Sequence, residues 1–531
     1  MKKQSLLYKW ILIIWFLVSL TITIPLVFKL IKLFSIQNGQ ALATKIVILV
    51  LLVINALIFC LFWLKSTKDL VFTFFFLFKR KSLLKRYDYI INSELSEEFK
   101  NKKVFLLYCT CDDFDKEALK KSMKQNYNNY EVVILDDSKK EEYIKQVDDF
   151  SKEYNIRVVR RENRIGFKAG NLNNFLKNNT DYDYFVVLDS DEIIPNNFII
   201  ESLKYFQSNP KIGALQAFHL ISEGKNFFQQ AIGNSSNVSS LSIHVLRNLY
   251  GETSLAGHGM MLSKEVYEKT GGFPHLLVED TSISAEVKKN NYEIVYAPNI
   301  VCYEEFPVDY IALKKRQGRW TAGNVQYIKK YAKVNRKINY KWFEKIDLRL
   351  NHYSLPIIPI ISLIFLINFI ILGFLKFNIT TNDIAFVIIW CIFLFLPLFI
   401  SVLEFSKQRR LIWALPTFIG TIITYTSMTV FLVASSLLGL FNKRVKFVVT
   451  PKESKKIKFI YIVLHSLIPI IFGVGVAVLT YFAWHTILPT LIISLPCVLT
   501  PFLIATSNIR LRTKEKVKNK HKQKQNKIKT I

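Results

Sequence analysis

Acidic residues gather at one point of a strongly basic chain. Residues 185–192 read FVVLDSDE, so an apolar run leads directly into Asp189, Asp191 and Glu192, whereas the whole chain of 531 residues has a formal net charge of +30. Neighbouring carboxylates repel one another unless a positive group lies between them. Acids at a strand end suit a divalent cation that carries a diphosphate, although on D-x-D evidence alone a solvated turn is the favoured explanation.

Three further motifs carry residues that could take part in the same chemistry. FKAGNLNN places Lys168 at the expected start of a helix, where a cation and free backbone amides can meet phosphate. LLVEDTSIS places Glu279 and Asp280 at the head of a helical stretch, and KKRQGRWTAG carries Arg319 and Trp320. A glycine turn, acids at a helix start and a basic helix on a membrane surface explain each motif separately. Their occurrence together, in this order, favours a functional site.

The elements that must position these motifs alternate along the middle of the chain. From Lys103, short apolar runs such as VFLLYCT, YEVVILD and YFVVLD alternate with stretches that can be helical, which predicts a mostly parallel sheet. Ligands bind at the carboxyl ends of the strands in such sheets. The acids Asp112–Asp113, Asp136–Asp137 and Asp189–Asp191 all fall at predicted strand ends.

Apolar residues on either side of this middle domain predict a membrane protein. The chain is 51% hydrophobic, and six runs of roughly the ~20 apolar residues that cross a bilayer are 8–30, 43–64, 353–375, 384–404, 458–482 and 484–507. A seventh run, 411–441, has basic residues on both flanks, so an interfacial helix keeps both flanks and the tail inside; a re-entrant hairpin is the alternative. The short run 70–78 also suits the interface.

Cysteine use and charge indicate the surroundings of the soluble part. The spacing of the six cysteines indicates no disulfide framework, which predicts that the soluble part faces a reducing cytosol. The basic tail has no interleaved aromatic residues, so anionic lipid is its expected partner and no nucleic acid is expected.

The motifs together resemble the membrane-integrated, processive glycosyltransferases of family 2, the group of cellulose, curdlan and hyaluronan synthases. The family order of motifs appears here as LDDS at 135–138, KAGN at 168–171, DSD at 189–191, VED at 278–280 and RQGRW at 316–320. FVVT at 447–450 is similar to a gating loop of cellulose synthases. Three stretches depart from the family pattern: Arg316 replaces a glutamine, LAGH at 255–258 replaces F-C-G-S, and CTCDD at 109–113 replaces an early P-T-Y-N-E.

The resemblance implies a role for each motif. It implies an α/β fold of the GT-A (Rossmann-like) type, with Mg²⁺ or Mn²⁺ on Asp189 and Asp191 and catalysis by Asp280 and Glu279. The residues implied in binding the nucleotide sugar are Thr110, Asp113, Asp136, Asp137, Lys168 and Asp189. The residues implied near the acceptor or diphosphate are Arg316, Gln317, Arg319, Trp320, Gly257 and His258, and the gating-like loop contains Phe447, Val449 and Thr450.

The expected organisation places the GT-A domain inside a polytopic helical membrane protein. The expected parts are a transmembrane hairpin (1–68), the GT-A domain (99–335), an interfacial segment with a second hairpin (336–404), an interfacial helix with the gating-like loop (405–457), a third hairpin (458–507) and a basic cytosolic tail (508–531). The chain is expected in the plasma membrane with its catalytic domain in the cytosol.

Three functions of different classes compete. The first is inverting, processive transfer from a UDP-sugar to a polysaccharide, coupled to export. The second is non-processive transfer to a lipid acceptor, and the third is a transporter or scaffold without enzymatic activity. The acid set argues against the third function because a scaffold needs no metal site, and the Arg319–Trp320 motif with the gating-like loop favours the first over the second.

Overall fold

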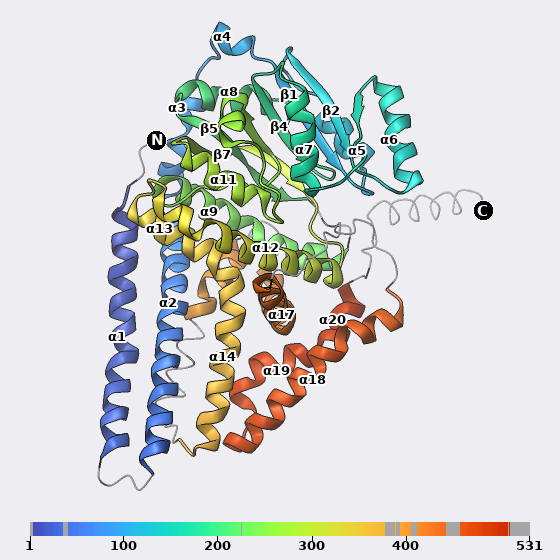
Figure 1. Cartoon of the computed structure of the whole chain (residues 1–531). Helices are drawn as coiled ribbons and strands as arrows, with labels where there is room; N and C mark the ends of the chain where they lie inside the picture. Colours follow the sequence, from blue (N-terminus) through green and yellow to red (C-terminus); the bar gives the residue numbers. More distant parts are fainter. Residues whose placement is uncertain are drawn as a thin grey trace, which may run out of the picture.

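A sheet covered by helices lies above a group of long helices. The computed structural model describes residues 4–35, 41–222, 224, 226–377, 388, 393–404, 411–441, 457–507 and 509. The sheet domain is at the top of Figure 1, and the helices α1, α2 and α14 run away from it side by side. The gating-like loop with Phe447, Val449 and Thr450, the tail from residue 510 and much of the expected span 384–404 lie outside the described residues.

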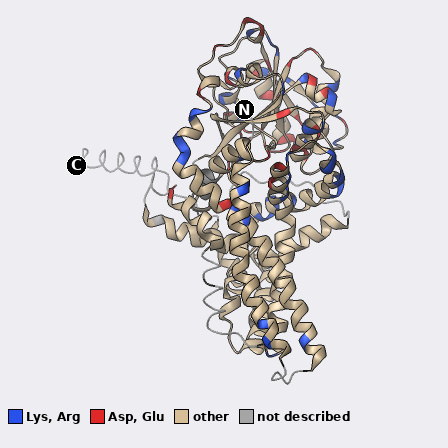
Figure 2. Cartoon of the chain, turned by 90° about the vertical axis from the view of Figure 1, so that its left-hand side faces the viewer, with Lys and Arg blue, Asp and Glu red and all other residues tan. Residues whose placement is uncertain are grey.

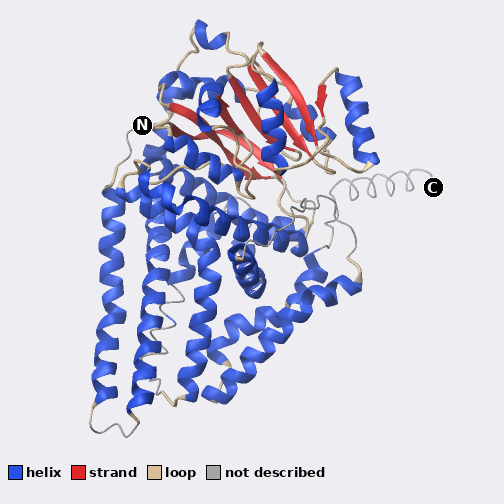
Figure 3. Ribbon diagram, in the orientation of Figure 1, coloured by secondary structure: helices blue, strands red, loops and turns tan. Residues whose placement is uncertain are grey.

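The sheet has seven strands in the order β3-β2-β1-β4-β6-β5-β7 (Figure 3). The strands are β1 Val104–Thr110, β2 Tyr130–Asp136, β3 Arg157–Val159, β4 Tyr184–Asp189, β5 Ile212–Ile221, β6 Met260–Ser263 and β7 Glu293–Glu304. The first four strands in sequence are parallel, and β6 is antiparallel to both β4 and β5. The predicted mostly parallel sheet is confirmed, with β6 as an antiparallel exception.

Helices cover both faces of the sheet, which is why its strands are apolar throughout. Leu106 and Val186 belong to one buried cluster, whereas Phe105 and Val187 belong to a cluster on the opposite face. Successive residues of a strand point to opposite faces, so both faces are buried. The helices of this domain are α5 Lys116–Ser122, α6 Glu141–Tyr154, α7 Phe167–Asn178, α8 Phe198–Ser208, α9 Asn234–Tyr250, α10 Lys264–Thr270 and α11 Glu279–Lys289, with short turns at α3 Asp88–Ile91 and α4 Glu97–Lys100.

Several helices are long and apolar enough to cross a membrane. Among the described residues these are α1 Leu6–Phe34, α2 Leu42–Lys85, α14 Ser354–Phe374 and α18 Phe459–Trp484. Two bent pairs also qualify when each is counted as one span: α16 Ala414–Thr426 with α17 Thr429–Leu440, and α19 Leu491–Val498 with α20 Thr500–Ser507. Figure 2 shows that the long helices carry few charged residues along most of their length. The chain is therefore a membrane protein with four to six spans by length and composition.

Two expectations about membrane segments change in the structure. The run 70–78, expected at the interface, continues α2, and its Phe72 and Phe76 are buried in the core of the sheet domain. The run 411–441, expected as an interfacial helix or a re-entrant hairpin, forms two helices bent by 43° relative to each other. A helix of this shape is a broken span or a re-entrant loop, and its place relative to the bilayer stays a prediction.

A buried ionic network joins the first two helices to the sheet domain. Asp347 of α13 (Trp342–Leu348) accepts hydrogen bonds from Tyr8 of α1 and, at 3.1 Å, from Arg247 of α9. Lys68 of α2 lies 3.4 Å from the same carboxylate, and both side chains are buried. Because buried charges are stable only when they are paired, this network fixes the helices α1 and α2 against the domain.

The helix α12, Tyr310–Lys337, connects the sheet domain to the long helices. In Figure 1 it lies between the sheet above and α14 and α17 below. Its contacts with both α14 and α17 hold it against the helices that could cross the membrane. The face of α12 that is directed toward the sheet therefore lies between the sheet domain and the long apolar helices.

Candidate active site

The carboxyl ends of three parallel strands meet at one edge of the sheet. Thr110 at the end of β1 pairs in register with Asp136 of β2, and Cys109 pairs with Asp189 of β4. This alignment brings the three sequence motifs that follow these strands to the same place, as the sequence predicted.

A cavity of about 280 Å³ opens at this edge, close to the lower end of the size range of small-molecule sites. Most of the predicted site residues line it: Thr110, Asp113, Asp137, Lys168, Asp189, Asp191, Gly257, His258, Glu279, Asp280, Arg316, Arg319 and Trp320. Asp136 and Gln317 do not line this cavity. Asp136 is buried and accepts hydrogen bonds from the Ser138 amide and from Arg160, and Gln317 is buried within α12. Their predicted binding roles stay predictions.

Two of the predicted nucleotide-binding acids are held in place by other protein groups. Arg161 donates two hydrogen bonds to Asp137, at 2.9 and 2.7 Å. Asp113 accepts from Thr110 at 3.0 Å and from Ser190 at 2.6 Å, and so it ties the end of β1 to the D-x-D turn. These contacts fix the shape of the turns that surround the cavity.

Lys168 brings a positive charge to the D-x-D acids. Its ammonium donates hydrogen bonds to Asp189 and, at 2.8 Å, to the carbonyl oxygen of Gly257. Burial alone would lower the pKa of Lys168, but Asp189 and neighbouring groups raise it above its usual value, so the ammonium stays charged. The Asp189 carboxylate remains 42% exposed despite this contact, which leaves one side of it open to the cavity.

The two candidate catalytic acids, Glu279 and Asp280, stand in the first turn of α11. The Thr281 amide donates to Asp280 at 2.7 Å. Burial raises the pKa of Asp280, and burial together with the Asp280 charge raises the pKa of Glu279 to about 7. Two neighbouring acids that titrate together suit proton transfer, because one can remain protonated while the other is ionised.

The face of α12 that points into the cavity carries Arg316, Arg319 and Trp320. Arg319 and Trp320 lie three and four positions after Arg316 and so share its face of the helix, whereas Gln317 follows Arg316 directly and points to an adjacent, buried face. The Arg316 guanidinium lies over two aromatic rings: its Cζ atom is 4.7 Å from the ring centroid of Trp320 and 4.9 Å from that of Phe306. Trp320 is 39% exposed, and its ring therefore offers an apolar face for a sugar.

The structure also shows site residues that the sequence analysis did not include. Glu304 and Glu305 at the end of β7 and Arg164 after β3 line the cavity. The Glu305 amide donates to Asp191 at 3.1 Å and so joins the end of β7 to the D-x-D turn. The acids follow an apolar run, IVCY, so the strand-end rule that identified Asp189 could have identified them.

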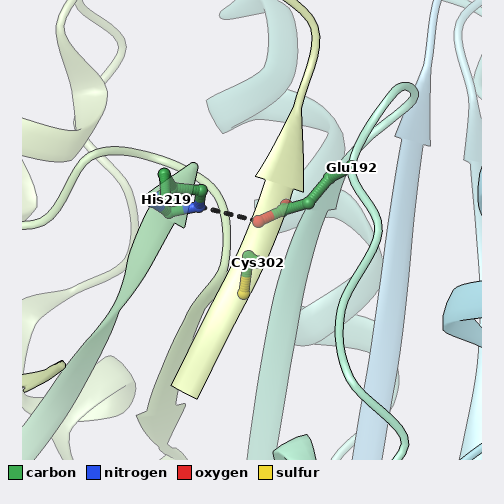
Figure 4. A group of neighbouring side chains, drawn as sticks. All are labelled: Glu192, His219 and Cys302. Carbon is green, nitrogen blue, oxygen red and sulfur yellow. Dashed lines mark hydrogen bonds and ion pairs between the residues drawn. The ribbon is translucent and has the colours of Figure 1, made fainter. Parts of the chain in front are cut away.

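A second group of side chains lies just behind the D-x-D turn (Figure 4). Glu192 and His219 form a contact of 2.8 Å, with the Cys302 thiol beside them. Burial alone would raise the pKa of Glu192, but His258 and His219 lower it to about 2. Burial raises the pKa of Cys302 well above its usual value, so the thiol packs as a small neutral side chain.

Comparison with known proteins agrees with this geometry. Residues 114–323 match the family described as "Glycosyltransferase like family 2". The segment covers most of the sheet domain, from just after β1 into α12, and includes the D-x-D turn, Lys168, Glu279–Asp280 and the Arg319–Trp320 motif. The sheet domain of this chain is therefore similar to the glycosyltransferases of family 2.

The individual relatives carry the names of enzymes of polysaccharide synthesis. A poly-beta-1,6-N-acetyl-D-glucosamine synthase of Staphylococcus epidermidis is 25% identical over 224 residues, which is 41% of this chain and 53% of that protein. A glucomannan 4-beta-mannosyltransferase of Arabidopsis thaliana is 26% identical over 39% of each protein. A glucans biosynthesis glucosyltransferase of Caulobacter vibrioides is 24% identical over 34% of this chain and 29% of that protein. The matches span about half or less of the length of these relatives.

Among solved structures, a mannosyltransferase from Pyrobaculum calidifontis in complex with GDP-Man and Mn2+ superposes with a TM-score of 0.46 at 16% identity, and it covers 73% of this chain and all of that one.

Proposed function

We propose that this chain transfers a sugar from a UDP-sugar, with inversion, to the end of a growing polysaccharide that passes through the membrane. One observation supports this proposal most: a single cavity unites the D-x-D acids, Lys168 and Asp280 with Trp320 of α12, and α12 packs against the membrane helices. In this proposal the protein lies in the plasma membrane with its catalytic domain in the cytosol, where nucleotide sugars are made.

In the proposed reaction these residues remove a proton from the acceptor and stabilise the leaving group. An acceptor hydroxyl oxygen attacks the anomeric carbon of the donor and forms the new glycosidic bond, while the bond to the diphosphate breaks and its electron pair leaves with the diphosphate. The hydroxyl proton passes to Asp280, which acts as the general base. Lys168 and Arg319 stabilise the negative charge of the leaving diphosphate.

Asp189 and Asp191 fit a divalent metal ion. Both carboxylates line the cavity, and Asp189 is open on one side. Carboxylate oxygens are the ligands that Mg²⁺ and Mn²⁺ prefer, and one or two of them suffice when a diphosphate completes the shell. Such an ion would add positive charge beside the leaving diphosphate. Thr110, Asp113 and Asp137, at the ends of β1 and β2, would hold the nucleotide.

The acceptor end of the cavity is proposed at α12. A sugar ring can stack on the exposed face of Trp320, with its terminal hydroxyl directed at Asp280. Glu279 stands beside Asp280 and keeps a second proton-binding group at this position. A lipid-linked acceptor in a non-processive enzyme would fit the same ring, and the position of α12 next to the membrane helices favours this second candidate over any soluble acceptor.

The test uses the full chain purified in lipid nanodiscs with a panel of radiolabelled UDP-sugars, Mn²⁺ and, in parallel, GDP-mannose. Transfer from one UDP-sugar into material that grows in length on a gel would support the proposal, and linkage analysis would then identify the polymer. A single sugar on material that extracts into organic solvent would support the lipid acceptor instead. No transfer from any UDP-sugar, with transfer from GDP-mannose, would contradict the assignment of the donor. The Asp191→Asn variant provides the background of each assay.

A further inference from the structure

Glu192 is the last residue of the DSDE sequence, yet it does not face the cavity. Its side chain is completely buried. Figure 4 shows that it points toward His219, with Cys302 beside it. Oε1 contacts Nε2 of His219 on β5 at 2.8 Å, and Oε2 accepts from the Gly259 amide at 2.9 Å. Both oxygens of this carboxylate are therefore occupied by protein groups, and those groups come from elements that are distant in sequence.

The imidazole of His258 lies between Glu192 and the cavity. Its Nδ1 is 3.3 Å from Glu192 Oε1, its Nε2 is 3.3 Å from Glu304 Oε2, and its ring packs against that of His219 with centroids 4.3 Å apart. Unlike Glu192, His258 lines the cavity. His258 is thus the point at which the buried group reaches the site.

The backbone next to His258 is built for this close approach. Gly259 has a φ of +52°, and a Cβ atom there would lie 2.3 Å from Glu192 Oε1 and 2.4 Å from His219 Nε2. Any side chain at this position would therefore collide with both Glu192 and His219. A left-handed conformation combined with such contacts requires glycine.

The position of His258 assigns it to the diphosphate end rather than to the base. The preceding residue, Gly257, faces Asp280: a Cβ atom on Gly257 would lie 3.4 Å from that of Asp280. His258 instead contacts Glu304, whose neighbour Glu305 donates its amide to Asp191 of the D-x-D motif. The short loop thus separates the two halves of the site, with His258 on the metal-binding side.

The charges around the cavity show what a positive group could contribute there. Carboxylates of the D-x-D motif, of Glu279–Asp280 and of Glu304–Glu305 all line this small space, and Lys168 is already bound to one of them. A diphosphate adds further negative charge. Burial alone would lower the pKa of His258, but Glu192 and the other nearby acids raise it to about 10, so the imidazole adds a positive charge.

We propose that Glu192 is a positioning residue that holds His258 on the cavity wall beside the D-x-D acids, where the imidazole binds the donor diphosphate together with Lys168. This inference rests on the proposed function, because it requires a nucleoside diphosphate donor. Partners that orient the groups of a metal or diphosphate site typically change affinity or activity by about 10–100-fold when they are removed.

The test measures binding rather than turnover alone. Calorimetry with Mn²⁺ and UDP as the probe compares the purified full-length chain with Glu192→Gln, His258→Asn and the double variant. Each single variant should weaken binding by about 10–100-fold. The double variant should be little weaker than Glu192→Gln, because two residues that act as one unit are not additive.

A matched control and a kinetic readout separate this role from a merely structural one. Cys302→Ala alters the same buried group without touching the cavity, and it should bind Mn²⁺ and UDP within about twofold of the wild type. In assays of sugar transfer, His258→Asn should raise the donor KM more than it lowers kcat, whereas a variant of Asp280 should lower kcat with little change in donor KM.

Several results would overturn the proposal. One such result is unchanged Mn²⁺–UDP affinity in a Glu192→Gln variant that melts at the wild-type temperature. Another is a double variant whose loss of affinity equals the product of the two single losses. If Glu192→Gln does not fold, His258→Asn decides alone, since its side chain lies at the cavity wall: unchanged binding and donor KM would refute the role. Wild-type protein that binds no Mn²⁺–UDP would overturn the proposed function as well, whereas wild-type binding with unaffected variants would overturn only this inference.

Discussion

The replacement of Asp280 by Asn separates catalysis from stability more sharply than any other change in the cavity. Loss of a general base typically slows a reaction by about 10²–10⁴-fold. Since each factor of ten corresponds to about 1.36 kcal/mol, the barrier should rise by about 2.7–5.4 kcal/mol. The structural cost is smaller: the variant loses one negative charge in the first turn of α11, which is worth about 0.3–1 kcal/mol.

The pH dependence of the rate gives a second signature. Burial raises the pKa of Asp280 above the ordinary value of about 3.9, and the active form is the ionised one. The rate should therefore fall as the pH decreases through this raised pKa, and Asp280→Asn should lack that acidic limb. Glu279 has a pKa raised to about 7 and titrates with Asp280, so Glu279→Gln should shift the limb rather than abolish it.

The assay combines sugar incorporation at saturating donor with UDP binding by calorimetry and a thermal melt. Glu286→Gln is the matched control, because it removes a charge from the same helix outside the cavity, where Glu286 pairs with Lys289 at 3.1 Å. The reasoning would be refuted if Asp280→Asn melted a few degrees lower but transferred sugar at nearly the wild-type rate with an unchanged acidic limb. In that case Asp280 would only stabilise the start of α11.

Three further predictions concern the metal site and the packing around it. Asp191→Asn should abolish transfer while the protein inserts and folds, and EDTA should silence the wild type until Mn²⁺ is restored; full activity of the variant with Mg²⁺ would contradict the ligand role. Asp347→Asn should destabilise the protein by about 3–5 kcal/mol because it removes the buried carboxylate that faces both Lys68 and Arg247 and leaves Glu252 as the buried acid beside Arg247, and a melting temperature equal to that of the wild type would argue against this. Gly318→Ala should cost about 1–3 kcal/mol, since its Cβ would lie 2.5 Å from the ring of Phe431, and a melt with the Cys302→Ala variant as control measures it.

The sequence predicted most of the cavity because strand ends can be read locally. An acid after an apolar run lies at the carboxyl edge whatever the neighbouring strands are, so Asp137, Asp189 and Asp191 could be placed before the sheet order was known. The pairing of Glu192 with His219 could not be predicted in this way. It depends on β4 and β5 lying on either side of β6, which follows only from the order and the antiparallel direction of the strands. No local spacing encodes that arrangement.

The length of α2 was missed for a different physical reason. The polar stretch KSTKD at 65–69 interrupts the apolar run and was interpreted as the end of a span. In the structure Lys65 pairs with Asp69 one turn away at 2.6 Å, and Lys68 is buried against Asp347. Charges that are satisfied by partners do not end a helix, and such partners lie beyond the reach of a pattern in one segment.

The geometry of α12 explains how a membrane helix can affect transfer at the cavity. One face of α12 carries Arg319 and Trp320 into the cavity, and another face has Gly318 against Phe431 of α17. Gly439 of α17 in turn approaches the backbone of α12 so closely that a side chain would have no room. Small residues let two helices approach until their backbones nearly touch, and at that distance neither can shift alone. Because α12 and α17 are packed this closely, a displacement of α17 would also move Trp320 of α12 relative to Asp280. The proposed acceptor position is therefore mechanically coupled to α17.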